Sequence, residues 1–173
     1  MGRTLIKLLF LPTLAWNVLL CRVSRSWNWW DRIDDHVLLG ALPFAKDVQS
    51  LHDSGVRAVI NLCDEYGGPA KTYENAGIEQ LHLPTVDFHA PSLVAIRRGV
   101  SFIDEHVQNG NTVYVHCKAG RGRSATLAMC WLIQDKSMTP VEAQTHLQQK
   151  RHQTVHELYC RDVVQQFYKL QRT

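Results

Sequence analysis

The stretch from residue 112 to residue 134 constrains the fold of this chain more than any other. Thr112 to His116 (T-V-Y-V-H) is rich in β-branched and aromatic residues, which predicts a buried strand. Ser124 to Gln134 predicts a buried helix, and the turn C-K-A-G-R-G-R joins the two. A strand that turns directly into a helix points several backbone N–H groups, and the positive end of the helix dipole, at one place. We therefore expect an anion-binding loop here.

The two ends of this loop carry side chains suited to phosphate chemistry. Cys117 stands at its start, where the N–H groups can stabilise a thiolate and lower the thiol pKa from about 8.5 toward or below neutrality. Arg123 closes the loop, and its planar guanidinium can hold two phosphate oxygens. We predict Cys117 as the nucleophile and Arg123 as the phosphate clamp. A lone cysteine is usually a buried apolar residue, so the prediction depends on the combination and its position.

The other loop residues are expected to shape the phosphate site. Gly120 and Gly122 allow the backbone to curl its N–H groups inward. Ser124 can hydrogen-bond the cysteine sulfur and help the thiolate leave a phosphocysteine intermediate, and His116 is expected to order the loop from behind. The residues predicted to line a bound phosphate are Lys118, Ala119, Gly120, Arg121, Gly122 and Arg123.

Phosphoester cleavage also needs a proton for the leaving oxygen. Asp87 is the best candidate, in the proline-bounded segment P-T-V-D-F-H-A-P at 84–91, which we expect to be an irregular loop. The flanking Val86 and Phe88 could raise its pKa by partial desolvation. From spacing alone, Asp87 could equally well cap or turn the loop, and His89 is the alternative donor. No cluster of His, Asp and Glu suggests a catalytic metal, so no cofactor is expected.

Short apolar runs alternate with helical segments along the rest of the chain. Strands are predicted at 36–39, 56–62 and 78–83, and helices at 45–54, 71–76 and 93–107. Two further helices with capping-box starts are predicted after Thr139 and after Thr154. This alternation predicts an α/β layered fold.

Bulk properties exclude several classes of protein. With 173 residues, 45% of them hydrophobic, the chain is long enough for one core but not for two ordinary domains. The 19 basic and 16 acidic residues are spread along most of the chain, and no basic stripe indicates nucleic-acid binding. The five cysteines are odd in number and lack paired spacing, which favours a reducing compartment over a disulfide framework.

The first thirty residues differ from the rest of the chain. They contain no acidic residue, several basic ones and an apolar run from Leu8 to Leu20. A secretory signal, a transmembrane helix and a cationic mitochondrial-type leader are the alternatives, together with a buried helix of the folded domain. The run is short for a membrane span, which favours the leader. We assign residues 1–30 to a targeting or membrane-contacting segment and residues 31–173 to one catalytic domain.

The segment H-C-K-A-G-R-G-R-S at 116–124 matches the H-C-x-x-G-x-x-R-[ST] signature of the protein tyrosine and dual-specificity phosphatase superfamily. V-L-L-G-A-L-P at 37–43, D-E-Y at 64–66 and T-V-D at 85–87 extend the likeness over nearly the whole chain. The chain resembles the mitochondrial phosphatidylglycerophosphate phosphatases of the dual-specificity class. The resemblance implies a central, mostly parallel sheet flanked by helices. It also implies that Cys117 is the nucleophile, Arg123 the phosphate-binding arginine and Asp87 the general acid, with Glu65 and Tyr66 near the pocket.

The same resemblance implies removal of the terminal phosphate of phosphatidylglycerophosphate, which leads toward cardiolipin, at the matrix face of the mitochondrial inner membrane. The expected partners are an anionic phospholipid substrate and, through the N-terminal segment, a membrane surface, while protein partners are not predicted. Two alternatives stay open. A dual-specificity protein phosphatase would use the same loop on phosphotyrosine and phosphoserine/threonine. A module that only recognises phosphate would be expected to lack the nucleophile, the clamp or the acid.

Overall fold

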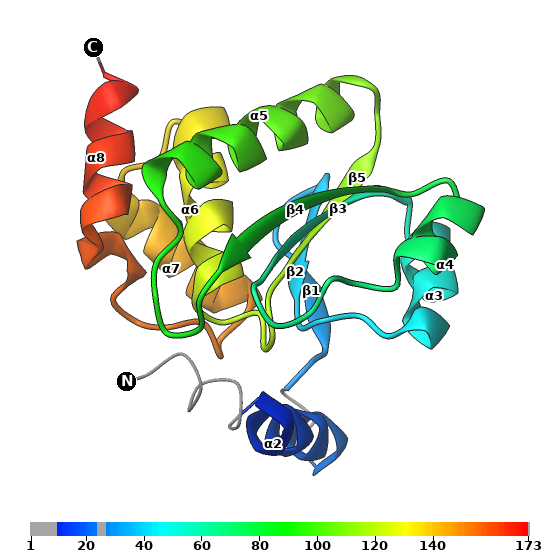
Figure 1. Cartoon of the computed structure of the whole chain (residues 1–173). Helices are drawn as coiled ribbons and strands as arrows, with labels where there is room; N and C mark the ends of the chain where they lie inside the picture. Colours follow the sequence, from blue (N-terminus) through cyan, green and yellow to red (C-terminus); the bar gives the residue numbers. More distant parts are fainter. Residues whose placement is uncertain (1–9, 24–26, 173) are drawn as a thin grey trace.

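The computed structural model of the protein describes residues 10–23 and 27–172. In that part of the chain one sheet has five strands in the order β1-β2-β5-β3-β4 (Figure 1). β1 runs antiparallel to β2, and every other neighbouring pair is parallel. The strands are β1 (Trp30–Arg32), β2 (Val37–Gly40), β3 (Val56–Cys63), β4 (Glu79–Thr85) and β5 (Thr112–His116). The predicted α/β fold with a mostly parallel sheet is confirmed.

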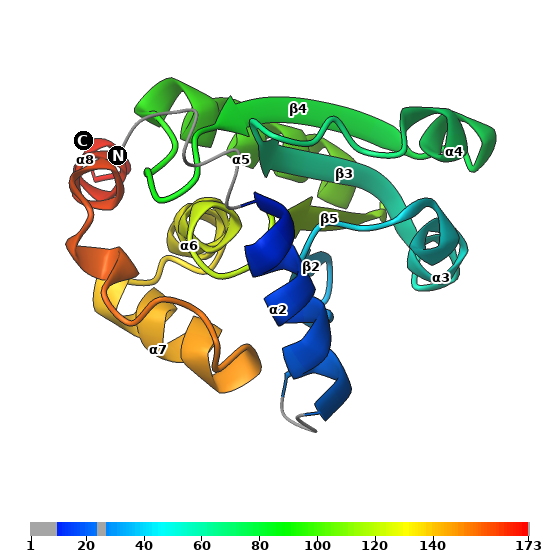
Figure 2. The same cartoon turned by 60° about the horizontal axis from the view of Figure 1, so that its bottom comes forward.

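Helices cover both faces of this sheet, and alternate strand residues feed the two cores (Figure 2). One core receives Val113 and Val115, whereas Tyr114 between them points into the other. The first core is covered by α5 (Leu93–Gln108), α6 (Arg123–Asp135), α7 (Pro140–Lys150) and α8 (Asp162–Leu170). The second is covered by α3 (Val48–Asp53) and α4 (Ala70–Asn75), and the 3-10 helix η1 (Ala45–Asp47) leads into α3. Helix α6 lies among α5, α7, α8 and the sheet, which is why all of its residues except the last two are buried.

Two of the predicted helix starts are confirmed by their caps. The hydroxyl of Ser92 accepts a hydrogen bond from the Ala95 N–H at the start of α5. At the start of α7, Thr139 and Glu142 form a reciprocal capping box.

The helix predicted after Thr154 is wrong. Only the short 3-10 helix η2 (Leu158–Cys160) forms there, and α8 begins later, at Asp162. The reason is tertiary: the Val155 N–H donates to the carbonyl of Arg121 (3.0 Å), and the Leu158 N–H donates to the side chain of Gln144 (2.9 Å). These bonds hold the backbone in an irregular path against α7 and the loop after β5.

Two strands also differ from expectation. β4 continues through Pro84 to Thr85, so the loop predicted at 84–91 is shorter than expected. Proline has no backbone N–H, and this is tolerated because β4 is an edge strand. β1 was not predicted, because three residues are too few to show a period. Its Trp30 packs edge-on against Tyr114, and the neighbouring Trp29 donates to the Leu42 carbonyl (3.0 Å).

The loop between β5 and α6 is held from two sides. Gly120 has φ +68°, and a side chain there would overlap the backbone of Gly40 at the end of β2. On the other side, the fully buried guanidinium of Arg151 donates to the Gly120 carbonyl (3.0 Å) and the Ala119 carbonyl (3.2 Å). Arg151 is also ion-paired with Asp31 of β1. The loop is therefore anchored to both β2 and β1.

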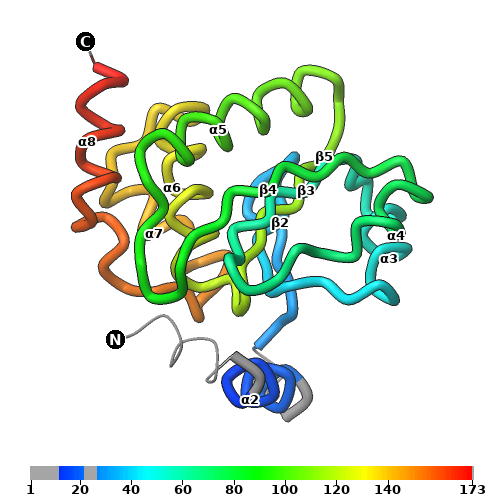
Figure 3. Tube along the Cα trace, viewed as in Figure 1, coloured from blue at the N-terminus to red at the C-terminus, as the bar shows by residue number. Residues whose placement is uncertain are grey.

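Helix α2 (Phe10–Val23) lies at the end of the molecule where this loop projects (Figure 3). It is tied to the segment before β1 by a hydrogen bond from the Trp27 indole N–H to the side-chain oxygen of Asn17 (3.1 Å). Among the described residues, none of the helices combines the length and apolarity that crossing a bilayer requires. The division of the chain at residue 30 stays a prediction, since residues 1–9 and 24–26 lie outside the described part.

Candidate active site

Cys117 sits at the C-terminal end of β5 with its sulfur buried among hydrogen-bond donors. The Ser124 hydroxyl donates to the sulfur (3.2 Å), and the backbone N–H groups of Ser124 and Ala119 also reach it. Burial by itself raises the pKa of the Cys117 thiol, but the Arg123 charge and these hydrogen bonds outweigh it and lower the pKa from 9.0 to about 7. A large fraction of the sulfur is therefore thiolate at neutral pH.

The Arg123 guanidinium is buried at the first turn of α6, and its orientation is set by two acceptors. Nη1 donates to the Glu65 carboxylate (2.8 Å) and to the carbonyl of Thr85 at the end of β4 (2.8 Å). Nη2 faces the Asp87 carboxylate at 3.0 Å. Glu65, predicted only as lying near the pocket, thus holds the predicted phosphate clamp, Arg123, in place.

Asp87 is held by two cations. One carboxylate oxygen contacts Lys118 Nζ and the other contacts Arg123 Nη2. The neighbouring Phe88 is 69% exposed, in a left-handed backbone conformation with φ 65°. A phosphate that binds Arg123 would compete with Asp87 for Nη2.

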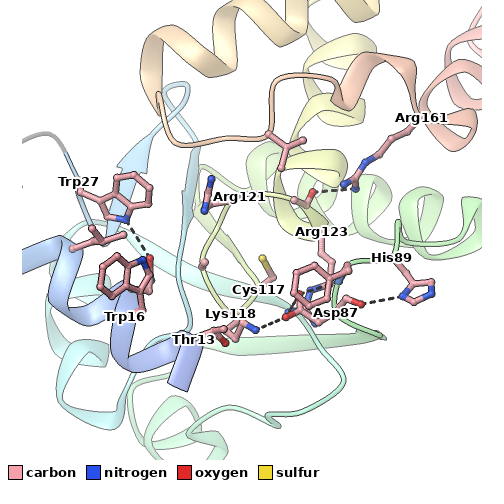
Figure 4. Close-up of a pocket in the computed structure, with 16 residues that line it drawn as sticks. Thr13, Trp16, Trp27, Asp87, His89, Cys117, Lys118, Arg121, Arg123 and Arg161 are labelled. Atoms are coloured by element: carbon pink, nitrogen blue, oxygen red, sulfur yellow. Dashed lines mark hydrogen bonds and ion pairs between the residues drawn. The ribbon is translucent and has the colours of Figure 1, made fainter. Parts of the chain in front are cut away.

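His89, the alternative donor, also lines the cavity but is exposed, with Nδ1 3.0 Å from the Asp87 backbone carbonyl (Figure 4). It makes no contact with Lys118 or Arg123. The geometry brings Asp87, not His89, into the group of charged side chains around Cys117.

The two remaining accessory residues support the loops. The His116 ring is buried, stacks on Tyr114 and lies close to the Cys117 carbonyl. Burial lowers the pKa of His116 to about 3, so its imidazole is neutral near pH 7 and serves as packing. The Tyr66 hydroxyl donates to the Pro43 carbonyl (2.9 Å), which ties the segment carrying Glu65 to the end of β2.

A cavity of about 390 Å³ opens above Cys117 (Figure 4). Lys118 and Asp87 lie on one side of the sulfur in this view, and Arg121 lies on the other. Arg121 is fixed by a hydrogen bond from Nε to the Gln153 carbonyl (2.7 Å) and lies over the Trp27 ring, 5.3 Å from its centroid.

Part of the cavity wall was not expected from sequence. These residues come from α2, from the segment before β1 and from the segment between α7 and α8. They are Thr13, Trp16, Asn17, Leu20, Trp27, Val155 and Arg161. The apolar run of the N-terminal segment was visible in the sequence, but nothing local indicated that it would lie over the phosphate loop. Within residues 10–23 and 27–172, no group of three or more His, Cys, Asp or Glu is placed to hold a metal ion.

Comparisons with known proteins agree with this geometry. Residues 37–169 match the model of the dual specificity phosphatase catalytic domain. Phosphatidylglycerophosphate phosphatase PTPMT2 of Arabidopsis thaliana is 42% identical over 168 residues, which cover 95% of this chain and 74% of that protein. Phosphatidylglycerophosphatase and protein-tyrosine phosphatase 1 of Rattus norvegicus is 43% identical over 80% of this chain and 77% of its own length.

A crystal structure of PTPMT1 in complex with PI(5)P has the same fold. It superposes with a TM-score of 0.77 at 36% identity, covering 84% of this chain and 97% of that one.

The thiolate at Cys117 can be titrated directly. We expect the rate of its alkylation by iodoacetamide to rise with pH around a midpoint of about 7, because the thiolate reacts and the thiol does not. Ser124→Ala removes one donor to the sulfur and should move the midpoint upward by about one pH unit. Mass spectrometry of the peptide containing Cys117 gives the rate, with Cys117→Ser as the blank. A midpoint near 9 in the unmodified chain would contradict the stabilised thiolate.

The acid can be tested through the leaving group. Asp87→Asn keeps the shape of the side chain and one acceptor oxygen for either Lys118 or Arg123, but it cannot donate a proton to an alkoxide. We expect kcat/KM to fall about 100-fold for alkyl phosphates and much less for p-nitrophenyl phosphate, whose leaving group is stable unprotonated. His89→Asn is the matched control and should leave both rates nearly unchanged. An equal loss on both substrates would assign the proton to another group.

Proposed function

The chain belongs to the dual-specificity phosphatase family, and on that basis we propose that it hydrolyses the terminal phosphomonoester of phosphatidylglycerophosphate to give phosphatidylglycerol. It is a cysteine-dependent phosphatase. The composition of the cavity is the observation that supports a lipid substrate. The nucleophile, clamp and acid lie at its floor, while Trp16, Leu20 and Trp27 line its wall.

In the first half of the proposed reaction the Cys117 thiolate attacks phosphorus. The S–P bond forms as the bond from phosphorus to the leaving oxygen breaks, and Asp87 gives its proton to that oxygen. The N–H groups of the loop and the guanidinium of Arg123 hold the three other oxygens, on which charge is spread in the transition state. Phosphatidylglycerol leaves, and the phosphate stays on the sulfur.

In the second half water attacks the phosphocysteine. Asp87, now ionised, accepts a proton from the water, and the S–P bond breaks as inorganic phosphate forms. The leaving thiolate is stabilised by the Ser124 hydroxyl, 3.2 Å from the sulfur. The same hydrogen bond thus serves both halves of the reaction.

The apolar wall beside the phosphate site favours a lipid over a phosphopeptide as the substrate. The acyl chains and glycerol of a lipid gain free energy by leaving water for Trp16, Leu20 and Trp27, at about 25 cal/mol per Å² of apolar area. A phosphoserine peptide would leave most of that wall exposed to water.

A substrate panel tests the proposed reaction. The purified full chain should turn over phosphatidylglycerophosphate with kcat/KM at least about tenfold higher than phosphotyrosine peptides, phosphoserine peptides or phosphatidylinositol 5-phosphate, a difference of about 1.4 kcal/mol. Released phosphate measures the rate, and Cys117→Ser is the blank. Equal or faster turnover of the phosphopeptides would replace the lipid with a phosphoprotein substrate.

We further propose that α2 lies on a membrane surface, and that this membrane is the matrix side of the mitochondrial inner membrane in the cardiolipin pathway. The exposure of α2 supports contact with an apolar environment. Among residues 12–21 of α2, for which exposure is described, only the polar Asn17 is buried. The apolar side chains of Trp16 and Leu19 are 62% and 50% exposed. A soluble helix normally shows the reverse pattern.

The membrane contact can be tested by replacing Leu19, which is exposed and does not line the cavity. Leu19→Glu should weaken binding to vesicles that contain anionic phospholipid by about tenfold or more, because it removes buried apolar area and adds like charge. Vesicle co-sedimentation measures binding.

Val141→Glu is the matched control, since Val141 is 59% exposed on α7, outside α2 and the cavity lining. It should bind vesicles like the unmodified chain. Both variants should hydrolyse p-nitrophenyl phosphate at the unmodified rate. If Leu19→Glu binds vesicles as well as the control does, α2 is not the membrane contact.

A further inference from the structure

Arg161 is a cation of the cavity that the proposed reaction does not yet use. It precedes α8 and reaches the cavity from the segment between α7 and α8. In Figure 4 it lies on the same side of the Cys117 sulfur as Arg121 and on the opposite side from Lys118 and Asp87. The cavity therefore has an acid on one side of the phosphate position and a basic side chain on the other.

The hydrogen bonds of Arg161 leave much of its guanidinium unused. Nη1 donates to the Thr126 hydroxyl (2.6 Å) and, at 3.5 Å, to the Gly122 carbonyl. Within the described part of the chain, Nε and Nη2 have no hydrogen-bond acceptor, and no carboxylate lies within 4.0 Å of the guanidinium. Burial lowers the pKa of Arg161, which shows that its charge is partly removed from water. A partly buried cation of this kind is stabilised by an anionic ligand.

The other cations of the cavity are already engaged. Lys118 and Arg123 are both paired with Asp87, and Arg123 also with Glu65. Arg121 is bonded to a backbone carbonyl and covered on one face by Trp27. Among the described residues, Arg121 and Arg161 are therefore the cavity cations without a carboxylate partner, and Arg161 is the one that approaches the loop from another segment of the chain.

Gly122 leaves this guanidinium open to the phosphate loop. A Cβ at position 122 would lie 3.6 Å from Arg161 Nη2, so a longer side chain there would stand between the two. Nη2 therefore borders the loop that is proposed to hold the first phosphate, with only the glycine between. Cys117 and Arg161 also line the same cavity, so a ligand with two phosphates can place one in the loop and the other at Arg161.

We infer that Arg161 binds the second phosphate of a substrate in which glycerol bridges two phosphate groups. This inference rests on the proposed function, because the phosphodiester of phosphatidylglycerophosphate is separated from its terminal phosphate by one glycerol. Arg161 is then a specificity-determining residue, with no part in breaking the S–P or P–O bonds. It would discriminate between lipid phosphates that share the same terminal phosphate.

Two short-chain lipids separate this role from a structural one. Dioctanoyl phosphatidylglycerophosphate has both phosphates, whereas dioctanoyl phosphatidate has the terminal phosphate alone. Arg161→Gln should lower kcat/KM about tenfold or more for the first lipid, mainly through KM, and less than twofold for the second and for p-nitrophenyl phosphate. Arg161→Lys, which keeps the charge, should recover most of the loss. Arg97→Gln, which removes an exposed charge on α5 that does not line this cavity, should change none of the rates.

A soluble pair of ligands tests Arg161 even if the lipid is not the substrate. Glycerol 1,3-bisphosphate should inhibit p-nitrophenyl phosphate hydrolysis more strongly than glycerol 3-phosphate, and Arg161→Gln should abolish the difference. Failure of the unmodified chain to hydrolyse phosphatidylglycerophosphate would overturn the proposed function alone. Equal inhibition by the two ligands, or an equal loss of activity on both lipids in Arg161→Gln, would overturn the role of Arg161.

Discussion

The pairing of the Cys117 thiolate with the Arg123 guanidinium is the interaction on which the rest of the site depends. Both groups are buried, and burying two charges costs more than their attraction returns unless the remaining donors and acceptors are satisfied. Ser124 supplies a donor to the sulfur, and Glu65 and the Thr85 carbonyl supply acceptors to the guanidinium. These partners come from α6, from the loop after β3 and from β4, so the pair exists only when the parallel sheet is assembled.

The scaffold explains how one loop can hold several N–H groups toward one point. A loop in this conformation must be held in place by its surroundings. Gly120 packs against Gly40 at the end of β2, and Arg151 binds the loop carbonyls and pairs with Asp31 of β1. The carbonyls are drawn outward to Arg151, which leaves the N–H groups to face the anion. Preorganised dipoles of this kind stabilise charge without reorganising during the reaction.

The cavity above this loop is asymmetric in a way that suits a lipid with two phosphates. Asp87 and Lys118 occupy one side, Arg161 the other, and α2 with Trp27 supplies the apolar wall. Asp87 contacts Arg123 Nη2, the atom through which the proposed reaction would bind a phosphate oxygen. The same α2 that lines the cavity carries Leu19 on its exposed surface, which connects the proposed membrane contact to the site.

The sequence alone determined the α/β alternation and the turn from Cys117 to Arg123 between a strand and a helix, and it predicted the chemical roles of the two ends of that turn. These follow from short-range physics: strand and helix periods, and the N–H groups that any strand-to-helix turn presents. The sequence also offered Asp87 as a candidate acid, and the resemblance to known phosphatases favoured that role over one in capping or turning the loop. Only the tertiary structure decided that two cations hold Asp87, that residues 154–158 bond to Arg121 and Gln144 instead of forming a helix, and that α2 and Arg161 complete the cavity. Each of these depends on contacts between residues far apart in the chain, and such contacts leave no periodic pattern in the sequence.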